Sequence, residues 1–122
     1  MNLAGLRVLL VEDEGMISLL FEEFLRELGC ETIGTAARLD DALHKASTLA
    51  LDAAVLDVNL AGKLSYPVAE ALKDRGIPFV FTTGYGSAAL PEALQDTPVL
   101  KKPFRQAQLA VALRSIGNCS SP

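Results

Sequence analysis

Three short apolar runs of this sequence end in side chains that could carry out phosphoryl chemistry. Glu12 and Asp13 close the first run, Asp57 closes the second, and Lys102 follows the third. Two like charges about 4 Å apart repel by roughly 4 kcal/mol at an effective dielectric constant near 20, so three neighbouring carboxylates need raised pKa values or a cation. We expect an acidic pocket that binds a divalent cation and presents one aspartate to phosphorus.

Oxygen ligands suit Mg²⁺, which binds one or two carboxylates and keeps several waters and phosphate oxygens. Asp13 and Asp57 are the expected direct ligands, and Glu12 is expected to act through water. The backbone carbonyl of Asn59 could complete the protein side of the site. Asp57 would then be a nucleophile that forms an acyl phosphate.

Two further side chains are expected to face the transferred phosphoryl group. The ammonium of Lys102 would neutralise its oxygens, and the hydroxyl of Thr83 would donate a hydrogen bond to it. Gly84 is expected to keep the pocket open, because a side chain there would crowd the entrance.

Each of these residues also has an ordinary structural explanation. Acidic residues after strands are often solvated or cap the next helix, and a single lysine such as Lys102 is usually a surface residue. Asp57 is less ordinary, because a charge that ends an apolar strand costs free energy unless it is exposed or used. The occurrence of all four positions together, in this order, favours a functional site over the separate structural explanations.

The elements that would position these residues follow from an alternation of short apolar runs with amphipathic segments, which is typical of repeated βα units. We predict an α/β fold with a five-stranded parallel sheet in the order 2-1-3-4-5 and helices on both faces. This order places the first and third strands side by side, with their carboxyl ends at the ligand-binding edge. The expected strands are Arg7–Val11, Thr32–Ala36, Ala53–Asp57, Phe79–Thr82 and Val99–Lys101.

Four segments carry apolar residues at helical spacing. The fourth connection is different, because Pro91 disfavours helix before it, so we expect only a short, mobile helical turn over Pro91–Gln95. Glycine follows the first helix at Gly29, and Gly117-Asn118 is expected to close the last one. The apolar stripes are Ile17, Leu20, Phe21, Phe24 and Leu28; Leu39, Ala42, Leu43 and Ala46; Val68, Ala71 and Leu72; and Leu109, Ala112, Leu113 and Ile116.

The 122 residues suit a single domain, 1–122, with a core of about 6–116 and a tail at 117–122. A net charge of −4 without a basic cluster argues against nucleic acid, and no apolar run could span a membrane or act as a secretory signal. Cys30 and Cys119 lack metal-binding spacing and are expected to be reduced bystanders in a cytoplasmic protein. His44 is expected to be solvated.

Four motifs together resemble those of bacterial response-regulator receiver domains, over about residues 6–116. They are Val11-Glu12-Asp13-Glu14, Val55-Leu56-Asp57-Val58-Asn59-Leu60, Thr83-Gly84 and Lys102-Pro103-Phe104. The resemblance implies a phosphoacceptor at Asp57, an acidic metal pair at Glu12 and Asp13, a switch hydroxyl at Thr83 and the phosphate-facing lysine at Lys102. It also implies a cis bond before Pro103.

The segment from Phe79 to Gly86 resembles a stand-alone subgroup of receivers that carries Phe-Ala-Thr-Gly-Tyr after the fourth strand. This chain departs from that motif with Thr82 in place of alanine. It departs from the wider family with Val99, where an aromatic switch residue usually stands. Tyr85 either takes over this role or is a surface tyrosine.

The function implied by the resemblance is a phosphorylation-dependent switch of a two-component phosphorelay. A sensor histidine kinase or phosphotransfer protein would phosphorylate Asp57 in the presence of Mg²⁺. The surface formed by the fourth and fifth strands and the helices after them would then change and act on a downstream protein. The chain would not be an enzyme with an external substrate, although it would assist its own phosphorylation and dephosphorylation. It could act alone or be part of a longer protein.

Three alternatives remain. A haloacid-dehalogenase-like phosphatase also uses a nucleophilic aspartate, but it would want an acid two residues after Asp57, where this chain has Asn59. A flavodoxin-like cofactor binder would need a phosphate loop in place of Glu12-Asp13-Glu14. A receiver that works only as a docking module would not need the acidic, hydroxyl and lysine positions together.

Overall fold

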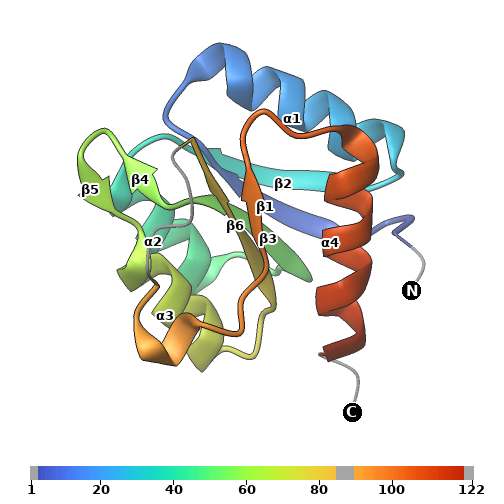
Figure 1. Ribbon diagram of the computed structural model, residues 1–122. Coiled ribbons are helices and arrows are strands. Elements are labelled where there is room, and N and C mark those ends of the chain that lie inside the picture. The colour runs from blue at the N-terminus through green and yellow to red at the C-terminus, as the bar shows by residue number, and fades with distance from the viewer. Residues whose placement is uncertain (1–2, 85–89, 120–122) are drawn as a thin grey trace.

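The fold is a five-stranded parallel sheet with helices on both faces, as the computed structural model in Figure 1 shows for residues 3–84 and 90–119. The sheet order is β2-β1-β3-β6-β7, which confirms the predicted order 2-1-3-4-5. Every neighbouring pair in this sheet is parallel. The strands are β1 (Arg7–Val11), β2 (Glu31–Ala36), β3 (Ala53–Asp57), β6 (Phe79–Thr83) and β7 (Val99–Lys101).

The central strands are apolar on both sides because both of their faces are covered. All residues of β3 and β6 are buried, whereas the edge strand β2 is mostly half-buried. Three strands have the predicted bounds. The other two differ by one residue, since β2 begins at Glu31 and β6 ends at Thr83.

Two helices pack on each face of the sheet, which confirms the predicted layers. In Figure 1, α1 (Gly15–Glu27) and α4 (Gln106–Cys119) lie on one side, and α2 (Leu39–Thr48) and α3 (Tyr66–Asp74) lie on the other. Each face has its own apolar core, one formed with α2 and α3 and one with α1 and α4. The sheet therefore separates two packed layers.

Two residues of the predicted apolar stripes are exposed. Leu20 of α1 is 45% exposed and Leu43 of α2 is 37% exposed. The contact of α1 with the core is centred instead on Phe21 and Leu25, and Leu25 is fully buried although it was not part of the predicted stripe. Phe21 stacks on Phe104 with ring centroids 4.5 Å apart, which fixes the side of α1 that faces the sheet.

A small antiparallel hairpin after β3 was not predicted. It pairs β4 (Asn59–Leu60) with β5 (Lys63–Leu64). Its two central residues have positive φ angles, 52° at Ala61 and 90° at Gly62. A two-residue turn of this kind favours Asn-Gly or Asp-Gly, so Ala-Gly gives only a weak signal in the sequence.

In the described part of the fourth connection, residues 90–98, the helical element is one 3₁₀ turn, η1 (Glu92–Leu94), as expected for a short element, and Pro91 precedes it. The last helix, in contrast, was predicted to end before Gly117, but its backbone continues to Cys119. One glycine in a helix costs only about 1 kcal/mol relative to alanine, so it does not end the helix by itself. No helix among the described residues is both long enough and apolar enough to cross a membrane.

Candidate functional site

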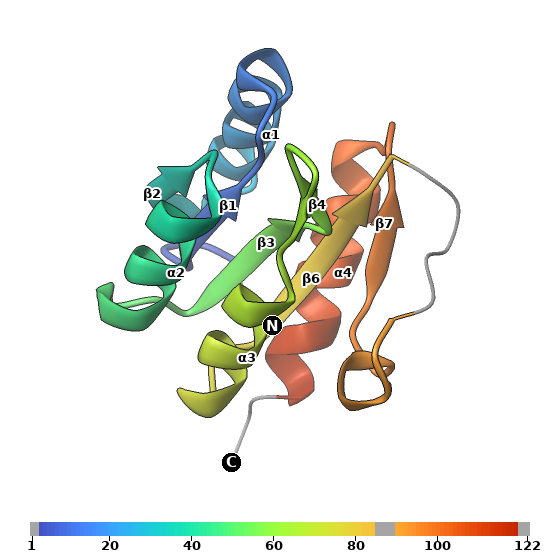
Figure 2. The ribbon, with the colours of Figure 1, turned by 90° about the vertical axis from the view of Figure 1, so that its left-hand side faces the viewer.

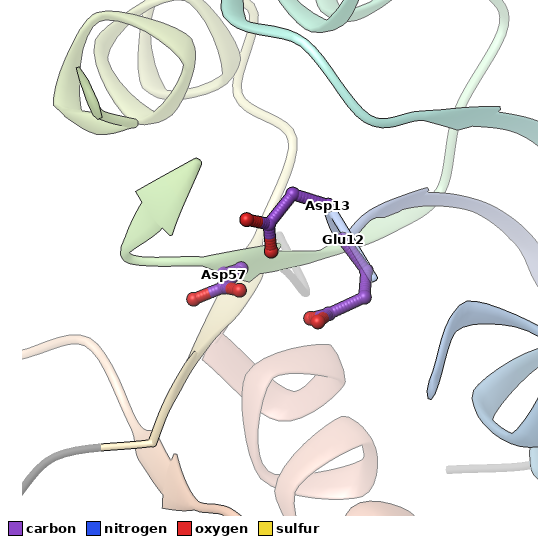
Figure 3. A group of neighbouring side chains, drawn as sticks. All are labelled: Glu12, Asp13 and Asp57. Atoms are coloured by element: carbon purple, nitrogen blue, oxygen red, sulfur yellow. The ribbon is translucent and has the colours of Figure 1, made fainter. Parts of the chain in front are cut away.

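The three predicted acidic residues meet at the carboxyl edge of the sheet, although the sequence separates them widely (Figure 3). Each of Glu12, Asp13 and Asp57 offers one carboxylate oxygen, and these oxygens lie within 4.8 Å of one another. The cause is the pairing of β1 with β3, which places Val11 beside Leu56. The residues that follow therefore leave the sheet together. Glu12 and Asp57 are 2% and 4% exposed.

The ammonium of Lys102 lies among the same carboxylates. Its Nζ is 3.1 Å from both carboxylate oxygens of Glu12 and 3.0 Å from Oδ2 of Asp57. The lysine directly follows β7, and its backbone N–H donates to the carbonyl of Thr83 at 2.7 Å. Because β6 lies between β3 and β7, the lysine side chain reaches past β6 to the acids. The bond between Lys102 and Pro103 is cis, as the motif implied.

Burial and mutual repulsion make this cluster unusually easy to protonate. Burial and the charge of Asp57 raise the pKa of Glu12 to about 7, although Lys102 opposes the shift. Burial likewise raises the pKa of Asp57 against the opposing effect of Lys102. Burial disfavours the charged form of Lys102, but its hydrogen bonds to Asp57 and Glu12 outweigh this effect and raise the pKa of the lysine. One ammonium therefore only partly compensates two buried carboxylates.

Replacing Glu12 by glutamine is expected to stabilise the protein above neutral pH when no divalent cation is present. The pKa of Glu12 rises from 4.5 to about 7 on folding, so the wild type should lose stability as the pH increases across this interval. At about 1.4 kcal/mol per pKa unit, the loss of stability of the wild type approaches about 3 kcal/mol above pH 7. This loss is measured by urea unfolding with a chelator present, at several pH values across the interval.

The matched control for this prediction is Glu70→Gln, because Glu70 is exposed on α3 and lies outside the cluster. The difference in the free energy of unfolding between Glu12→Gln and the wild type should grow with pH. The free energy of unfolding of the control should follow that of the wild type. A Glu12→Gln variant that is less stable than the wild type above pH 7 would contradict the assigned repulsion.

The β4–β5 hairpin holds two of the acids in place. The backbone N–H of Ala61 donates to Oδ2 of Asp13 at 3.0 Å, and the N–H of Asn59 donates to Oδ1 of Asp57 at 3.2 Å. Oδ1 of Asn59 in turn accepts a hydrogen bond of 2.7 Å from the N–H of Gly62. Sequence reasoning missed Ala61, since an alanine backbone amide carries no motif, and it missed the asparagine side-chain contact within the hairpin.

The two remaining predicted residues lie at the end of β6. Thr83 is the last residue of this strand and is 5% exposed. Gly84 follows it and is exposed, and a Cβ atom built there would meet no atom of the described residues within 4 Å. The expectation that a side chain at position 84 would crowd the entrance is therefore wrong. Tyr85 lies outside the described residues, and Val99 is 41% exposed on β7.

Thr82, where the similar motif carries alanine, is buried beside the phosphoacceptor candidate. It pairs in register with Asp57, is 1% exposed, and its Oγ1 has no hydrogen-bond partner among the described residues. A buried unpaired hydroxyl costs about 1–3 kcal/mol. Thr82→Val keeps the shape and removes the hydroxyl, so its free energy of unfolding in urea should rise by about 1 kcal/mol.

Thr32→Val on the half-buried strand β2 is the control for this substitution and should change stability little. A clear loss of stability in Thr82→Val, with no such loss in the control, would mean that the Thr82 hydroxyl has a hydrogen-bond partner in solution.

On the side of α1, a hollow of about 310 Å³ beside Lys102 is lined in part by Ile17, Leu20, Gly84 and Phe104. The cluster thus combines carboxylate oxygens that suit a hard cation, a nearly buried aspartate and an ammonium in contact with it. The cation ligands and the positive charge both surround one carboxylate. This arrangement fits a site for phosphoryl transfer better than a site for proton transfer alone.

Comparisons with known proteins agree with this geometry. A family model described as the response regulator receiver domain matches residues 8–114. The transcriptional regulatory protein PdtaR of Mycobacterium tuberculosis is 31% identical over 111 residues, which are 88% of this chain and 54% of that protein. The chain thus spans about half the length of the curated relatives it matches.

Two solved structures of SdrG are also similar. The solution structure of SdrG from Sphingomonas melonis Fr1 is 42% identical, with a TM-score of 0.82, and the match covers 95% of this chain and 98% of SdrG. The BeF3-activated conformation of SdrG, from Pseudomonas melonis Fr1, is 42% identical with a TM-score of 0.78, and the match covers 93% of this chain and 98% of that one.

Proposed function

This chain belongs to the response regulator receiver domain family of two-component signalling, and from this premise we propose that Asp57 is its phosphoacceptor and that phosphorylation switches its β6–β7–α4 side. The observation that carries the proposal is the contact of one ammonium with two buried carboxylates, Glu12 just after β1 and Asp57 at the end of β3. Lys102 Nζ lies 3.0 Å from Asp57 and 3.1 Å from Glu12. Chemistry at Asp57 would therefore act directly on the position of Lys102.

The carboxylates support Mg²⁺ as the cofactor. Three carboxylate oxygens within 4.8 Å of one another form a hard, all-oxygen donor set, which suits this ion. Asp13 and Asp57 would bind it directly, Glu12 through water, and Asn59 through its backbone carbonyl. When bound, Mg²⁺ would neutralise negative charge on the phosphoryl oxygens.

The transfer itself needs one nucleophile and two groups that receive the phosphoryl oxygens. A carboxylate oxygen of Asp57 forms a bond to phosphorus as the bond from phosphorus to the donor's imidazole nitrogen breaks, and the imidazole keeps the electron pair. Lys102 and the hydroxyl of Thr83 stabilise the transferred group. The donor would be a sensor histidine kinase or a phosphotransfer protein.

The same two residues provide the path from the phosphorylated site to the surface. Thr83 ends β6 and Lys102 directly follows β7, and the backbone N–H of the lysine is bonded to the carbonyl of the threonine. A shift of either residue toward the phosphoryl group would therefore move both strand ends. SdrG, which is 42% identical, has a BeF3-activated conformation, and this supports a similar response here. A downstream protein would read the changed surface.

The proposal is tested by incubating the protein with Mg²⁺ and acetyl phosphate and measuring its intact mass. We expect one added phosphoryl group, which requires Mg²⁺ and is removed by hydroxylamine, because an acyl phosphate is cleaved by this nucleophile. Protein without an adduct under these conditions would favour a docking module that is not phosphorylated. Steady release of phosphate from many monoesters would favour a phosphatase.

A further inference from the structure

Thr82 is held next to Asp57 by the pairing of two central strands. Figure 2 shows β6 between β3 and β7, and the register of β3 with β6 pairs Asp57 with Thr82. The backbone N–H of Val58 donates to the carbonyl of Thr82 at 2.9 Å, which continues this pairing one residue beyond Asp57. On the other side, Thr82 pairs with Leu100 of β7. The sheet therefore fixes the position of Thr82 relative to the proposed phosphoacceptor.

The side chains of Asp57 and Thr82 belong to the same face of the sheet. Successive side chains of a strand point to opposite faces, and neighbouring strands lie about 4.8 Å apart. Val55 of β3 and Val80 of β6 are part of the core formed with α1 and α4. Asp57 and Thr82 follow these two valines by two positions each. Both side chains therefore start from the face that α1 and α4 cover, one strand apart.

The hydroxyl of Thr82 has no hydrogen-bond partner in the part of the chain that the structure describes. The residue is 1% exposed, so solvent does not reach the hydroxyl from the surface. Buried hydroxyl groups of folded proteins nearly always have a partner, so an unpaired one beside a reactive carboxylate points to a use in another state of the protein. The motif that this segment resembles has alanine here, so a strand of this type does not need the hydroxyl.

Asp57 can accept one more hydrogen bond. An ionised carboxylate has about four acceptor positions. Its Oδ1 accepts from the N–H of Asn59 at 3.2 Å, and its Oδ2 accepts from Nζ of Lys102 at 3.0 Å. Under the proposed function, Lys102 turns toward the phosphoryl oxygens once Asp57 is phosphorylated. One oxygen of Asp57 then bridges to phosphorus, and the other, a carbonyl oxygen, no longer shares the ammonium.

We propose that the hydroxyl of Thr82 donates a hydrogen bond to this carbonyl oxygen of phosphorylated Asp57 and thereby shortens the lifetime of the acyl phosphate. The inference rests on the proposed function, because it concerns the acyl phosphate at Asp57. In the hydrolysis, the oxygen of a water molecule forms a bond to phosphorus as the bond from phosphorus to the Asp57 oxygen breaks. The carboxylate keeps the electron pair, and the protons of the water pass to the released phosphate and to solvent.

The proposed hydrogen bond favours the transition state over the acyl phosphate. The negative charge that the leaving carboxylate acquires spreads over both of its oxygens, and hydrogen bonds to ionised acceptors are stronger than those to neutral ones. A donor placed at the carbonyl oxygen is therefore worth more as the bond to phosphorus breaks. The net contribution of one ordinary hydrogen bond corresponds to roughly threefold to tenfold in rate.

The test measures how long the phosphoryl adduct survives. The wild type, Thr82→Val and Thr82→Ser are labelled with acetyl phosphate and Mg²⁺, the donor is removed by rapid desalting into buffer with Mg²⁺, and the loss of the adduct is followed by intact mass. We expect a lifetime roughly threefold to tenfold longer in Thr82→Val, which keeps the shape but lacks the hydroxyl. Thr82→Ser, which keeps the hydroxyl, should stay close to the wild type. The control Thr32→Val on β2 should also match the wild type.

Three results with these variants would overturn the inference. The first is a lifetime of Thr82→Val less than about threefold longer than that of the wild type. The second is a lifetime of Thr82→Ser closer to that of Thr82→Val, because the methyl group and not the hydroxyl would then matter. The third is an equal lengthening in Thr32→Val, which would show that the effect does not belong to the site.

A measurement on the wild type tests the hydrogen bond without any variant. The signal of the Thr82 hydroxyl proton should move downfield when Mg²⁺ and beryllofluoride are added, because a new hydrogen bond deshields the proton. An unchanged signal would overturn the inference even if a variant failed to fold. A wild type that acquires no adduct refutes the proposed phosphorylation and this inference with it. A labile adduct with equal lifetimes in the wild type and Thr82→Val refutes only this inference.

Discussion

Asp57→Ala is expected to abolish labelling by acetyl phosphate, which is the largest effect predicted for this protein. The variant lacks the carboxylate oxygen that would form the bond to phosphorus, and it also removes one of the three carboxylates that would hold the cation. Intact mass after incubation with Mg²⁺ measures the result. We expect the hydroxylamine-labile adduct of the wild type to disappear completely.

Two further variants distinguish the loss of the nucleophile from the loss of a negative charge. Asp57→Asn keeps the shape of the side chain but is a poor nucleophile, so it should behave like Asp57→Ala. Asp74→Asn removes a carboxylate from the exposed end of α3 and should be labelled like the wild type. Unchanged labelling of Asp57→Ala would place the phosphoacceptor elsewhere and end the proposed mechanism.

Lys102→Ala is expected to retain Mg²⁺ binding and to lose most of the conformational response to beryllofluoride. The carboxylates that would bind the cation remain, whereas the ammonium that links Asp57, the proposed phosphoacceptor, to the end of β7 is lost. Backbone amide shifts of β6, β7 and α4 measure the response. Without a cation the variant should also lose about 3 kcal/mol of stability at alkaline pH, because Glu12 and Asp57 are left buried without a partner charge.

The stability loss should shrink in acid, where both carboxyl groups can take up a proton, and added Mg²⁺ should restore part of it. Lys63→Ala is the control, since Lys63 is exposed on β5 and has no ion pair among the described residues. A full beryllofluoride response in Lys102→Ala would contradict the role assigned to this lysine.

The sequence predicted the sheet and the meeting of the acids because both depend on simple patterns. Buried parallel strands are apolar throughout, so runs such as those that end at Val11 and Asp57 identify them. Once the strand order is known, residues at the carboxyl ends of neighbouring strands must be close. The convergence of Glu12, Asp13 and Asp57 follows from these two rules.

Other features could not be predicted because they depend on backbone geometry or on the details of packing. Ala61 binds Asp13 through its amide, and a backbone amide has no residue-type signature. Leu20 and Leu25 are five positions apart on α1 and point in different directions, and the packing of the helix buries Leu25, one turn after Phe21, but leaves Leu20 45% exposed. The unpaired hydroxyl of Thr82 likewise depends on which neighbours surround it.

The hairpin after β3 has one more consequence, which concerns chain length. Exposed turns usually tolerate insertions. Here the amide of Ala61 is fixed to Asp13 and that of Asn59 to Asp57, so each added or deleted residue between them would shift one carboxylate relative to the other. We therefore expect the spacing between residues 57 and 62 to be invariant among homologues, even where the residue types in this turn have diverged.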